Sequence, residues 1–404
     1  MVIASKEWEI NLLDIKAAFL QGKALTRDVY LKPPREANMR GKLWKLKQYV
    51  YGLDDASRNF YMTVKEQLLK VGCRCSQLDQ AVFTYHNPDL EGLLMSHVDD
   101  FLWAGSTQFE VSVIDRIRST FKVSSENSNS FTYVGIQVQL YSDGIYISQK
   151  DYTNELEMIP TKHLSDRKPD DLITEEEKHS LRSTIGSLNW LAGQTRPDLS
   201  YDVCQLSSSL KEGSVNLLGH ANRVIKKAKA YDVSLHFPKM DLNNLSVYCY
   251  SDASHGNLSN GGSQGGLFTE IRCGSMSCPI EWQSKRIRRM AKSTLSAETI
   301  AMVEAMDSAF YIKHLLQDMI FNNKPQDIPI YCLTDNYSLF QTAHSTTAVT
   351  ERRLRIEIAC VREAIDRGEV DLKWVSSKDQ YADCLTKATC DTQKLLSRIS
   401  RIDD

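Results

Sequence analysis

Residues 91–105 read EGLLMSHVDDFLWAG, in which two adjacent acids separate two apolar runs. Apolar runs on both sides of a short polar centre are typical of two strands joined by a tight turn, so we expect a hairpin with Asp99 and Asp100 at its tip. Adjacent carboxylates repel each other, and burying them without partners is unfavourable. Two interpretations are open: a solvated Asp-Asp turn, or a metal site, because Mg²⁺ prefers carboxylate oxygens as ligands.

An upstream acid extends the second interpretation. In residues 8–22, WEINLLDIKAAFLQG, apolar side chains alternate with others before Asp14, which predicts a strand with this acid at its end. Together with Asp99 and Asp100, three carboxylates would then lie at strand ends. Such a set could hold two metal ions ~3.5–4 Å apart, the spacing that in-line phosphoryl transfer requires.

The C-terminal half carries a second set of acids in apolar surroundings. Apolar residues follow a three–four spacing over residues 295–319, which predicts a helix, and Glu298 falls on its apolar face. The strand-like stretches YCYSD and IYCLTD end in Asp252 and Asp335, and Asp383 follows a third strand-like stretch and a loop. Each acid alone would be interpreted as a cap or a turn residue. Four of them in this order favour a second metal site.

Length and composition restrict the classes of protein that fit. The chain has 404 residues, of which 42% are hydrophobic and 25% charged. These values are ordinary for a globular protein of two or three domains, and they exclude wholesale disorder. No apolar run reaches the ~18 residues of a membrane helix, so no membrane partner is expected. Ten cysteines, without two close pairs at zinc-site spacing, are interpreted as reduced thiols.

The charge balance bears on nucleic-acid binding. The formal net charge is −2, so attraction to polyanions is not a property of the bulk charge and would have to come from local patches. Residues 285–292, KRIRRMAK, lead directly into the predicted helix that carries Glu298. We favour this segment as a contact to the phosphates of a nucleic-acid hybrid over a merely solvated face.

The ordered set of motifs resembles the reverse transcriptase and ribonuclease H portion of a copia-type retrotransposon Pol polyprotein. In the first part the resemblance rests on LLDIKAAFLQG, LWKLKQYVYGLDDASRNFY and HVDDFLWAG, and in the second on SDAS, EWQSKRIRRMAKSTLSAE, LTDNYS and YADCLTK. It covers nearly the whole chain. It implies an α+β polymerase palm and connection, followed by an α/β ribonuclease H-like domain with a mixed sheet.

The resemblance also implies roles for single residues in the first part. Phe19 matches the aromatic residue that crowds the sugar 2′ position and selects deoxynucleotides, while Tyr51 and Gly52 match the segment that lies against the incoming nucleotide and template. The implied ligands of the polymerase metals are Asp14, Asp99 and Asp100.

In the second part, the resemblance implies a ribonuclease H site in which two Mg²⁺ ions activate a water against the RNA phosphate. The polymerase site is likewise expected to hold two Mg²⁺ ions. Recognition of the RNA strand would rest on its 2′-hydroxyls. The matching carboxylates are Asp252, Glu298, Asp335 and Asp383.

The implied function is RNA-directed DNA synthesis with degradation of the RNA template. We predict a reverse transcriptase palm and thumb-like part over residues 1–158 with most of the fingers missing, a connection over residues 159–240, and a ribonuclease H-like domain over residues 241–404. The expected partners are an RNA template, a DNA primer, an RNA–DNA hybrid, deoxynucleoside triphosphates and the rest of a Pol polyprotein. No targeting signal is seen, and a cytoplasmic virus-like particle or the nucleus is the expected location.

Two alternatives belong to other classes of protein. One is a catalytically silent remnant of a mobile element, which the missing fingers and the acids Asp54 and Asp55, in place of the usual Lys and Gln, favour. We therefore expect the ribonuclease of this chain to act alone and the polymerase to fail alone. The other is a nucleic-acid-binding module without chemistry, against which four clustered carboxylates near a polyanion argue.

Overall fold

The computed structural model describes residues 1–39, 41–161, 166–211, 213–258 and 261–400. The chain divides into two compact units: a smaller one formed by Lys6–Phe131 with Leu315–Pro325, and a larger one formed by Met1–Ser5, Thr132–His314 and Gln326–Asp404. The predicted boundaries after residues 158 and 240 stay predictions. In the described ranges, every helix is too short or too polar to cross a bilayer.

The smaller unit is built on a six-stranded antiparallel sheet in the order β4-β5-β6-β7-β1-β8. Helices α2 (Ala56–Lys70), α3 (Thr107–Phe109) and α4 (Asp115–Thr120) supply the apolar side chains that cover it, with α3 and α4 joined by a π-helical turn. A separate short sheet pairs β2 (Tyr30–Leu31) with β3 (Trp44–Lys45). The six strands are β1 (Asn11–Ile15), β4 (Arg74–Cys75), β5 (Val82–His86), β6 (Leu90–His97), β7 (Asp100–Gly105) and β8 (Val123–Ser128).

The predicted hairpin is confirmed, since β6 and β7 pair in antiparallel register on either side of the turn at Val98 and Asp99. The strand predicted before Asp14 is confirmed as β1. The polar, turn-prone composition of residues 123–130, VSSENSNS, predicts a break in packing, but the segment forms β8 and the start of β9 (Ser130–Tyr133). That prediction was wrong because β8 is an exposed edge strand, whose backbone pairs with β1 while polar side chains face solvent.

The larger unit contains two sheets. One has four strands in the order β12-β11-β10-β9, and the other has five in the order β15-β14-β13-β16-β17. In the second sheet β15, β14 and β13 are antiparallel, whereas β13, β16 and β17 are parallel, so the predicted mixed sheet is present. The strands are β9 (Ser130–Tyr133), β10 (Ile136–Tyr141), β11 (Gly144–Ser148), β12 (Ser234–Pro238), β13 (Ser246–Ser254), β14 (Ser263–Cys273), β15 (Met276–Ile287), β16 (Ile330–Thr334) and β17 (Asp371–Trp374).

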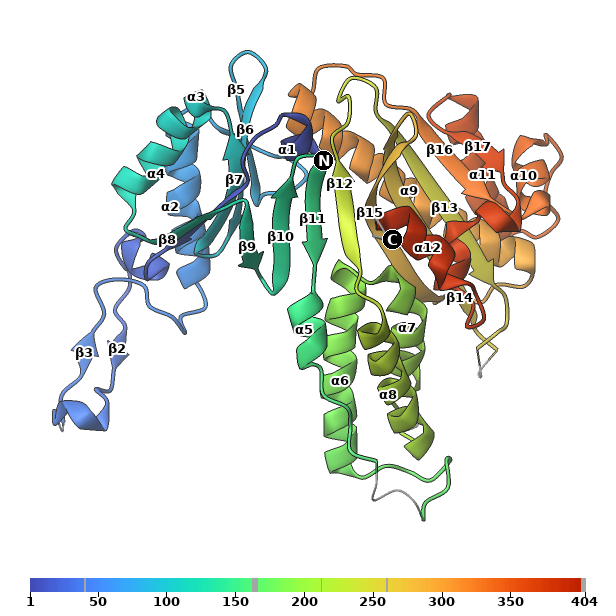
Figure 1. Cartoon of the computed structure of the whole chain (residues 1–404), viewed down its shortest axis with the longest axis horizontal. Coiled ribbons are helices and arrows are strands. Elements are labelled where there is room, and N and C mark those ends of the chain that lie inside the picture. Colours follow the sequence, from blue (N-terminus) through green and yellow to red (C-terminus); the bar gives the residue numbers. More distant parts are fainter. Residues whose placement is uncertain (40, 162–165, 212, 259–260, 401–404) are drawn as a thin grey trace. The chain divides into compact units, whose positions relative to one another are not determined.

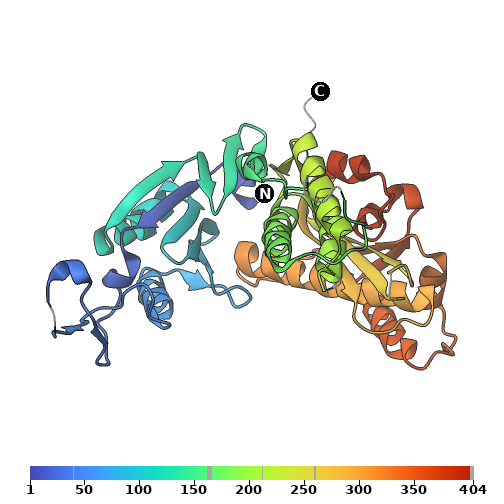
Figure 2. The ribbon, with the colours of Figure 1, turned by 90° about the horizontal axis from the view of Figure 1, so that it is seen from below.

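Three helices of this unit, α6, α7 and α8, contact one another as a bundle, which Figure 1 shows in green and Figure 2 shows from below. Helix α6 begins where Thr174 and Glu177 satisfy each other's backbone N–H groups, a capping box. The helices of the unit are α1 (Val2–Ser5), α5 (Lys150–Glu155), α6 (Glu175–Gln194), α7 (Ser200–Ser209), α8 (Val215–Ala230), α9 (Thr294–Phe321, with its last turns in the smaller unit), α10 (Tyr337–His344), α11 (Leu354–Asp366) and α12 (Thr392–Ile399).

Candidate metal centres

The topology of the mixed sheet brings two of the predicted acids together. Strands β13 and β16 are parallel neighbours with Tyr250 opposite Leu333, so their carboxyl ends lie at the same edge of the sheet. Asp252 lies two residues beyond Tyr250, still within β13, and Asp335 directly follows β16. The two carboxylates therefore project from equivalent places on adjacent strands.

Helix α9 adds a third carboxylate from its buried face. The side-chain oxygens of Asp252, Glu298 and Asp335 lie within 4.8 Å of one another. Across the ranges that the structure describes, this is the one set of three or more His, Cys, Asp or Glu side chains with such spacing. The cysteines, by contrast, are free thiols.

The carboxylates of Asp252, Glu298 and Asp335 lack a compensating positive charge among themselves. Asp252 and Glu298 are 1% and 4% exposed, and Oε2 of Glu298 has no hydrogen-bond partner. Burial, with the nearby charges of Asp252 and Asp335, raises the pKa of Glu298 to about 9. Burial also raises the pKa of Asp252. A divalent cation with oxygen ligands would satisfy the unpartnered oxygen and stabilise all three charges, so these residues fit Mg²⁺.

The fourth predicted acid, Asp383, lies in a 3₁₀ segment, Tyr381–Leu385, outside the group of three. This segment is tied to the sheet, because Gln380 Nε2 donates to the carbonyl of Ser251 at 2.9 Å and Ser284 Oγ donates to the carbonyl of Leu385 at 2.6 Å. These bonds set the distance between Asp383 and the strand that carries Asp252.

Gly266 permits this close approach. It lies opposite Asp252 on β14, and a Cβ atom there would come within 2.8 Å of both Leu385 Cβ and Thr386 Cγ2. Such a distance is too short for two carbon atoms, so any larger residue would push the segment off the strand. The site thus depends on a glycine that no acidic motif marks.

Two side chains that sequence reasoning missed lie directly on the acids. The hydroxyl of Thr386 donates to Asp252 Oδ2. Lys387 Nζ lies 2.8 Å from Asp383 Oδ1 and 3.4 Å from Asp252 Oδ2. Both residues lie in the motif YADCLTK, and the four-residue spacing from Asp383 to Lys387 places these two side chains on one face of a helical turn.

The basic segment 285–292 is partly committed to internal ion pairs. Lys285 pairs with Glu304 at 2.7 Å, and Arg289 pairs with Glu357. Three further cations of the segment are exposed and face solvent: Arg286, Arg288 and Lys292. These three can reach a polyanion without breaking a bond within the chain.

In the smaller unit, the antiparallel register places two acids opposite each other. Asp14 of β1 pairs with Asp100 of β7, and the N–H of Ile15 donates to the carbonyl of Asp99 at 2.9 Å. Burial raises the pKa of Asp100, and the charges of Asp14 and Asp99 add to that effect. The predicted acids of this unit therefore lie close enough for their charges to repel one another, although their oxygens are spaced more widely than those of the other set.

The turn before these acids is strained. Val98 has a φ of +57°, in the left-handed region that a β-branched residue rarely adopts. In the next residue, Asp99 Oδ2 accepts a hydrogen bond from the Tyr51 hydroxyl at 3.1 Å. A non-glycine residue held in this region costs on the order of 1–3 kcal/mol, and such residues cluster at functional sites.

The predicted nucleotide-binding residues gather at the same place. The rings of Phe19 and Tyr51 lie 4.4 Å apart, centre to centre, and Phe19 is part of the core while Tyr51 is exposed. Gly52 has a φ of +96°, which a residue with a side chain would rarely adopt. The acid that stands in place of the usual Gln, Asp55, forms an ion pair with Arg27 at 2.8 Å.

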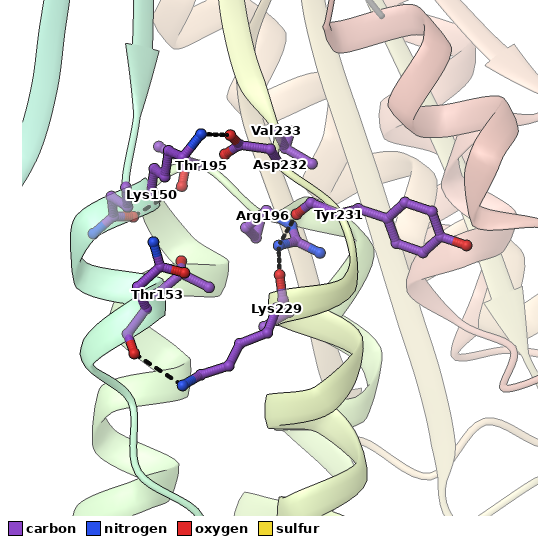
Figure 3. A pocket seen from close by; sticks show the side chains of 11 residues that line it. Lys150, Thr153, Thr195, Arg196, Lys229, Tyr231, Asp232 and Val233 are labelled. Atoms are coloured by element: carbon purple, nitrogen blue, oxygen red, sulfur yellow. Dashed lines mark hydrogen bonds and ion pairs between the residues drawn. The ribbon is translucent and has the colours of Figure 1, made fainter.

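A cavity of about 120 Å³ lies between α5, the segment before α7 and the end of α8, and none of the predicted acids lines it. As Figure 3 shows, several of the polar groups that line it are bonded to one another. Arg196 donates to the carbonyls of Ala228 and Tyr231, and Lys150 pairs with Asp232. We interpret the cavity as a joint between these elements, because its cations are already bonded to carboxylates or carbonyls of the chain itself.

Comparison with known proteins places this geometry in context. Residues 1–171 match the family described as reverse transcriptase (RNA-dependent DNA polymerase). The chain is 27% identical to the retrovirus-related Pol polyprotein from transposon RE2 of Arabidopsis thaliana, over 96% of this chain and 27% of that protein. It is 25% identical to the one from transposon TNT 1-94 of Nicotiana tabacum, over 95% of this chain and 30% of that protein. The chain thus spans less than a third of the length of these relatives.

Among solved structures, the foamy viral protease-reverse transcriptase in complex with an RNA/DNA hybrid has a similar fold, with a TM-score of 0.55 and 10% sequence identity. The match covers 92% of this chain and 44% of that one. At this identity the likeness concerns the fold alone. Together with the antiparallel and mixed sheets, it confirms the predicted fold class, α+β followed by an α/β ribonuclease H-like part.

Proposed function

Because the chain is a relative of the copia-type Pol polyproteins, with a reverse transcriptase domain over residues 1–171, we propose that it functions in RNA-directed DNA synthesis and as a ribonuclease H, with the ribonuclease active in this chain alone and the polymerase inactive alone. The observation that carries this proposal is the buried carboxylate set Asp252, Glu298 and Asp335. A pure binding protein gains nothing from three clustered carboxylates beside a polyanion, whereas a metal-dependent nuclease needs them.

In the proposed ribonuclease site, the three grouped carboxylates would hold Mg²⁺ and Asp383 would complete the set. When bound, Mg²⁺ would supply an activated water and stabilise the charge that develops on the scissile phosphate. Burial of Asp252 and Glu298 keeps competing water away from the ligands. The exposed cations Arg286, Arg288 and Lys292 would hold the phosphates of an RNA–DNA hybrid.

In the proposed polymerase site, Phe19 and Tyr51 form the wall against which the deoxynucleotide would lie, with Gly52 beside them. The Tyr51 hydroxyl orients Asp99 through its hydrogen bond. Asp14, Asp99 and Asp100 would bind the polymerase Mg²⁺ ions. The proposed partners are an RNA template, a DNA primer and deoxynucleoside triphosphates, and the proposed location is a cytoplasmic particle or the nucleus.

The decisive experiment is cleavage of the RNA strand of an RNA–DNA hybrid. We expect cutting with Mg²⁺, none with EDTA, and none by the Asp252→Asn variant, because this acid lies at the centre of the carboxylate set. Gel analysis of a labelled RNA strand measures the rate, and circular dichroism checks that each variant is folded. Absence of cutting by folded wild-type protein would contradict the proposal and favour a silent remnant.

The polymerase acids are tested by metal binding. In an Asp252→Asn background, which disables the other site, we expect Mn²⁺ to bind the smaller unit and Asp100→Asn to abolish that binding. The reason is that Asp100 lies close enough to Asp14 and Asp99 for their charges to interact, so its loss would remove one of three neighbouring ligands. Electron paramagnetic resonance of free Mn²⁺ measures the effect. Asp89→Asn removes an acid that precedes β6, at the opposite end of that strand from Asp99 and Asp100, and serves as the control. Equal Mn²⁺ binding with and without Asp100 would exclude this site.

A further inference from the structure

Lys387 occupies a place that the motifs did not assign. Its ammonium lies 2.8 Å from Asp383 Oδ1 and 3.4 Å from each carboxylate oxygen of Asp252. It therefore bridges the one acid outside the group of three and the buried acid at the centre of that group. These two carboxylates hold the Lys387 ammonium at the site, although the side chain is partly exposed to solvent.

The two halves of the site differ in what neutralises them. In the group of three acids, no ammonium or guanidinium among the described residues lies within ion-pair distance of Glu298 or Asp335. Oε2 of Glu298 also has no hydrogen-bond partner. Between Asp252 and Asp383, a cation that belongs to the chain is already present. The first position is open to a divalent ion, whereas the second is held by an ammonium.

We propose that Lys387 is a built-in counter-cation that stabilises the metal-free site and must leave the space between Asp252 and Asp383 before a second divalent ion can bind there. This inference rests on the proposed function, since it concerns the metals of that site. Lys387 is a positioning residue in this scheme: it acts on Asp252 and Asp383 and transfers no proton or phosphate.

The geometry supports such an exchange. An ammonium and a metal ion compete for the same carboxylate oxygens. Two positive charges bound to the same carboxylates also repel each other strongly. The Lys387 side chain is 42% exposed, so the ammonium has solvent into which it can withdraw. A lysine side chain has four rotatable bonds, so the Lys387 ammonium can withdraw by side-chain rotation without a change of the backbone.

The test is Mg²⁺ binding by Lys387→Met, which removes the charge and keeps most of the volume. We expect this variant to bind one more Mg²⁺ ion per chain than wild type, with overall affinity raised on the order of tenfold or more. Isothermal titration calorimetry measures both quantities, and ions bound elsewhere cancel in the comparison. Lys378→Met removes an exposed lysine of the same loop region and is expected to behave as wild type.

A metal-free measurement gives a second readout. In EDTA, Lys387→Met is expected to melt at least about 2 °C below wild type. The reason is that, among the described residues, Lys387 is the only cation paired with Asp252 and Asp383. Adding Asp383→Asn to this variant should recover part of the loss. Should Lys387→Met fail to fold, Lys387→Gln, which also lacks the charge but can still donate to Asp383, replaces it in both measurements.

The outcomes separate the two proposals. Mg²⁺ binding of equal affinity and stoichiometry in wild type, Lys387→Met and Lys378→Met would overturn the counter-cation and leave the metal site standing. No binding in any of the three would overturn the proposed function, and the inference with it. Weaker binding by Lys387→Met than by wild type would show that the lysine assists the metal, which is the reverse of the proposal.

Discussion

Replacement of Glu298 by Gln is expected to slow cleavage of the RNA strand of a hybrid more than about 100-fold. Mutation of a residue that only hydrogen-bonds to a metal ligand typically lowers activity by about 10- to 100-fold. We expect a larger effect here, because Glu298 itself would bind the metal. Its Oε2 has no other partner, and its neighbours Asp252 and Asp335 lie within 4.8 Å. A neutral amide would leave the metal with one ligand charge fewer in a buried place.

The same substitution should leave the fold intact, which separates chemistry from stability. Near neutral pH, burial keeps the metal-free Glu298 carboxyl protonated, since its pKa is raised to about 9. A protonated carboxyl and an amide have nearly the same shape and both lack charge in the folded state, whereas the unfolded wild-type glutamate ionises, so we expect Glu298→Gln to melt no lower than wild type in EDTA at pH 7.

The cleavage assay needs a control that changes the same charge on the same helix. Asp307→Asn serves this purpose, because Asp307 lies on α9 and is exposed. We expect this control to cut at the wild-type rate. A Glu298→Gln variant that cuts within a few-fold of wild type, at equal Mg²⁺ concentration, would remove Glu298 from the proposed site.

The grouped acids could be predicted because each obeys a local rule. Alternation along a strand places Asp252 and Asp335 at strand ends, and helical spacing places Glu298 on a buried face. Once the strands are parallel neighbours, their carboxyl ends must meet. The structure confirms that these three side chains converge, and it leaves their catalytic roles as predictions.

Lys387 could not be predicted in the same way, because its position depends on packing that has no sequence period. The segment that carries it sits against β14 only because Gly266 lacks a side chain, and Gln380 holds it through a backbone carbonyl. A single glycine in a strand-like stretch has several ordinary explanations. Likewise, nothing in the sequence indicated that Val98 adopts a left-handed conformation, because β-branched residues normally avoid it.

The error over residues 123–130 has the opposite cause. Polar, turn-prone side chains hid a strand, because β8 draws its pairing from the backbone of β1 and exposes its side chains. The polarity of a side chain indicates whether it prefers solvent or the core. In an edge strand, that polarity does not reveal whether the backbone pairs with a neighbouring strand.

The metal-free protein is expected to lose stability as the pH rises from about 5 to about 9. In the unfolded chain a glutamate has its ordinary pKa of ~4.3, whereas burial and the charges of Asp252 and Asp335 raise the pKa of folded Glu298 to about 9. Between these values the folded state holds a proton that the unfolded state has released. The free energy of unfolding therefore falls by about 1.4 kcal/mol per pH unit from this group.

The direction of the effect follows from the sign of the shift. The stabilising contribution is fully present below the unfolded pKa and is lost as the pH rises through the folded value. Melting temperatures in EDTA at several pH values between 5.5 and 9 measure it, and Glu298→Gln should show a shallower decline than wild type because its amide does not titrate. Saturating Mg²⁺ should reverse the trend in wild type alone, since metal binding requires the deprotonated carboxylate. Parallel declines in both proteins would mean that Glu298 releases its proton at an ordinary pH and that its burial does not control the site.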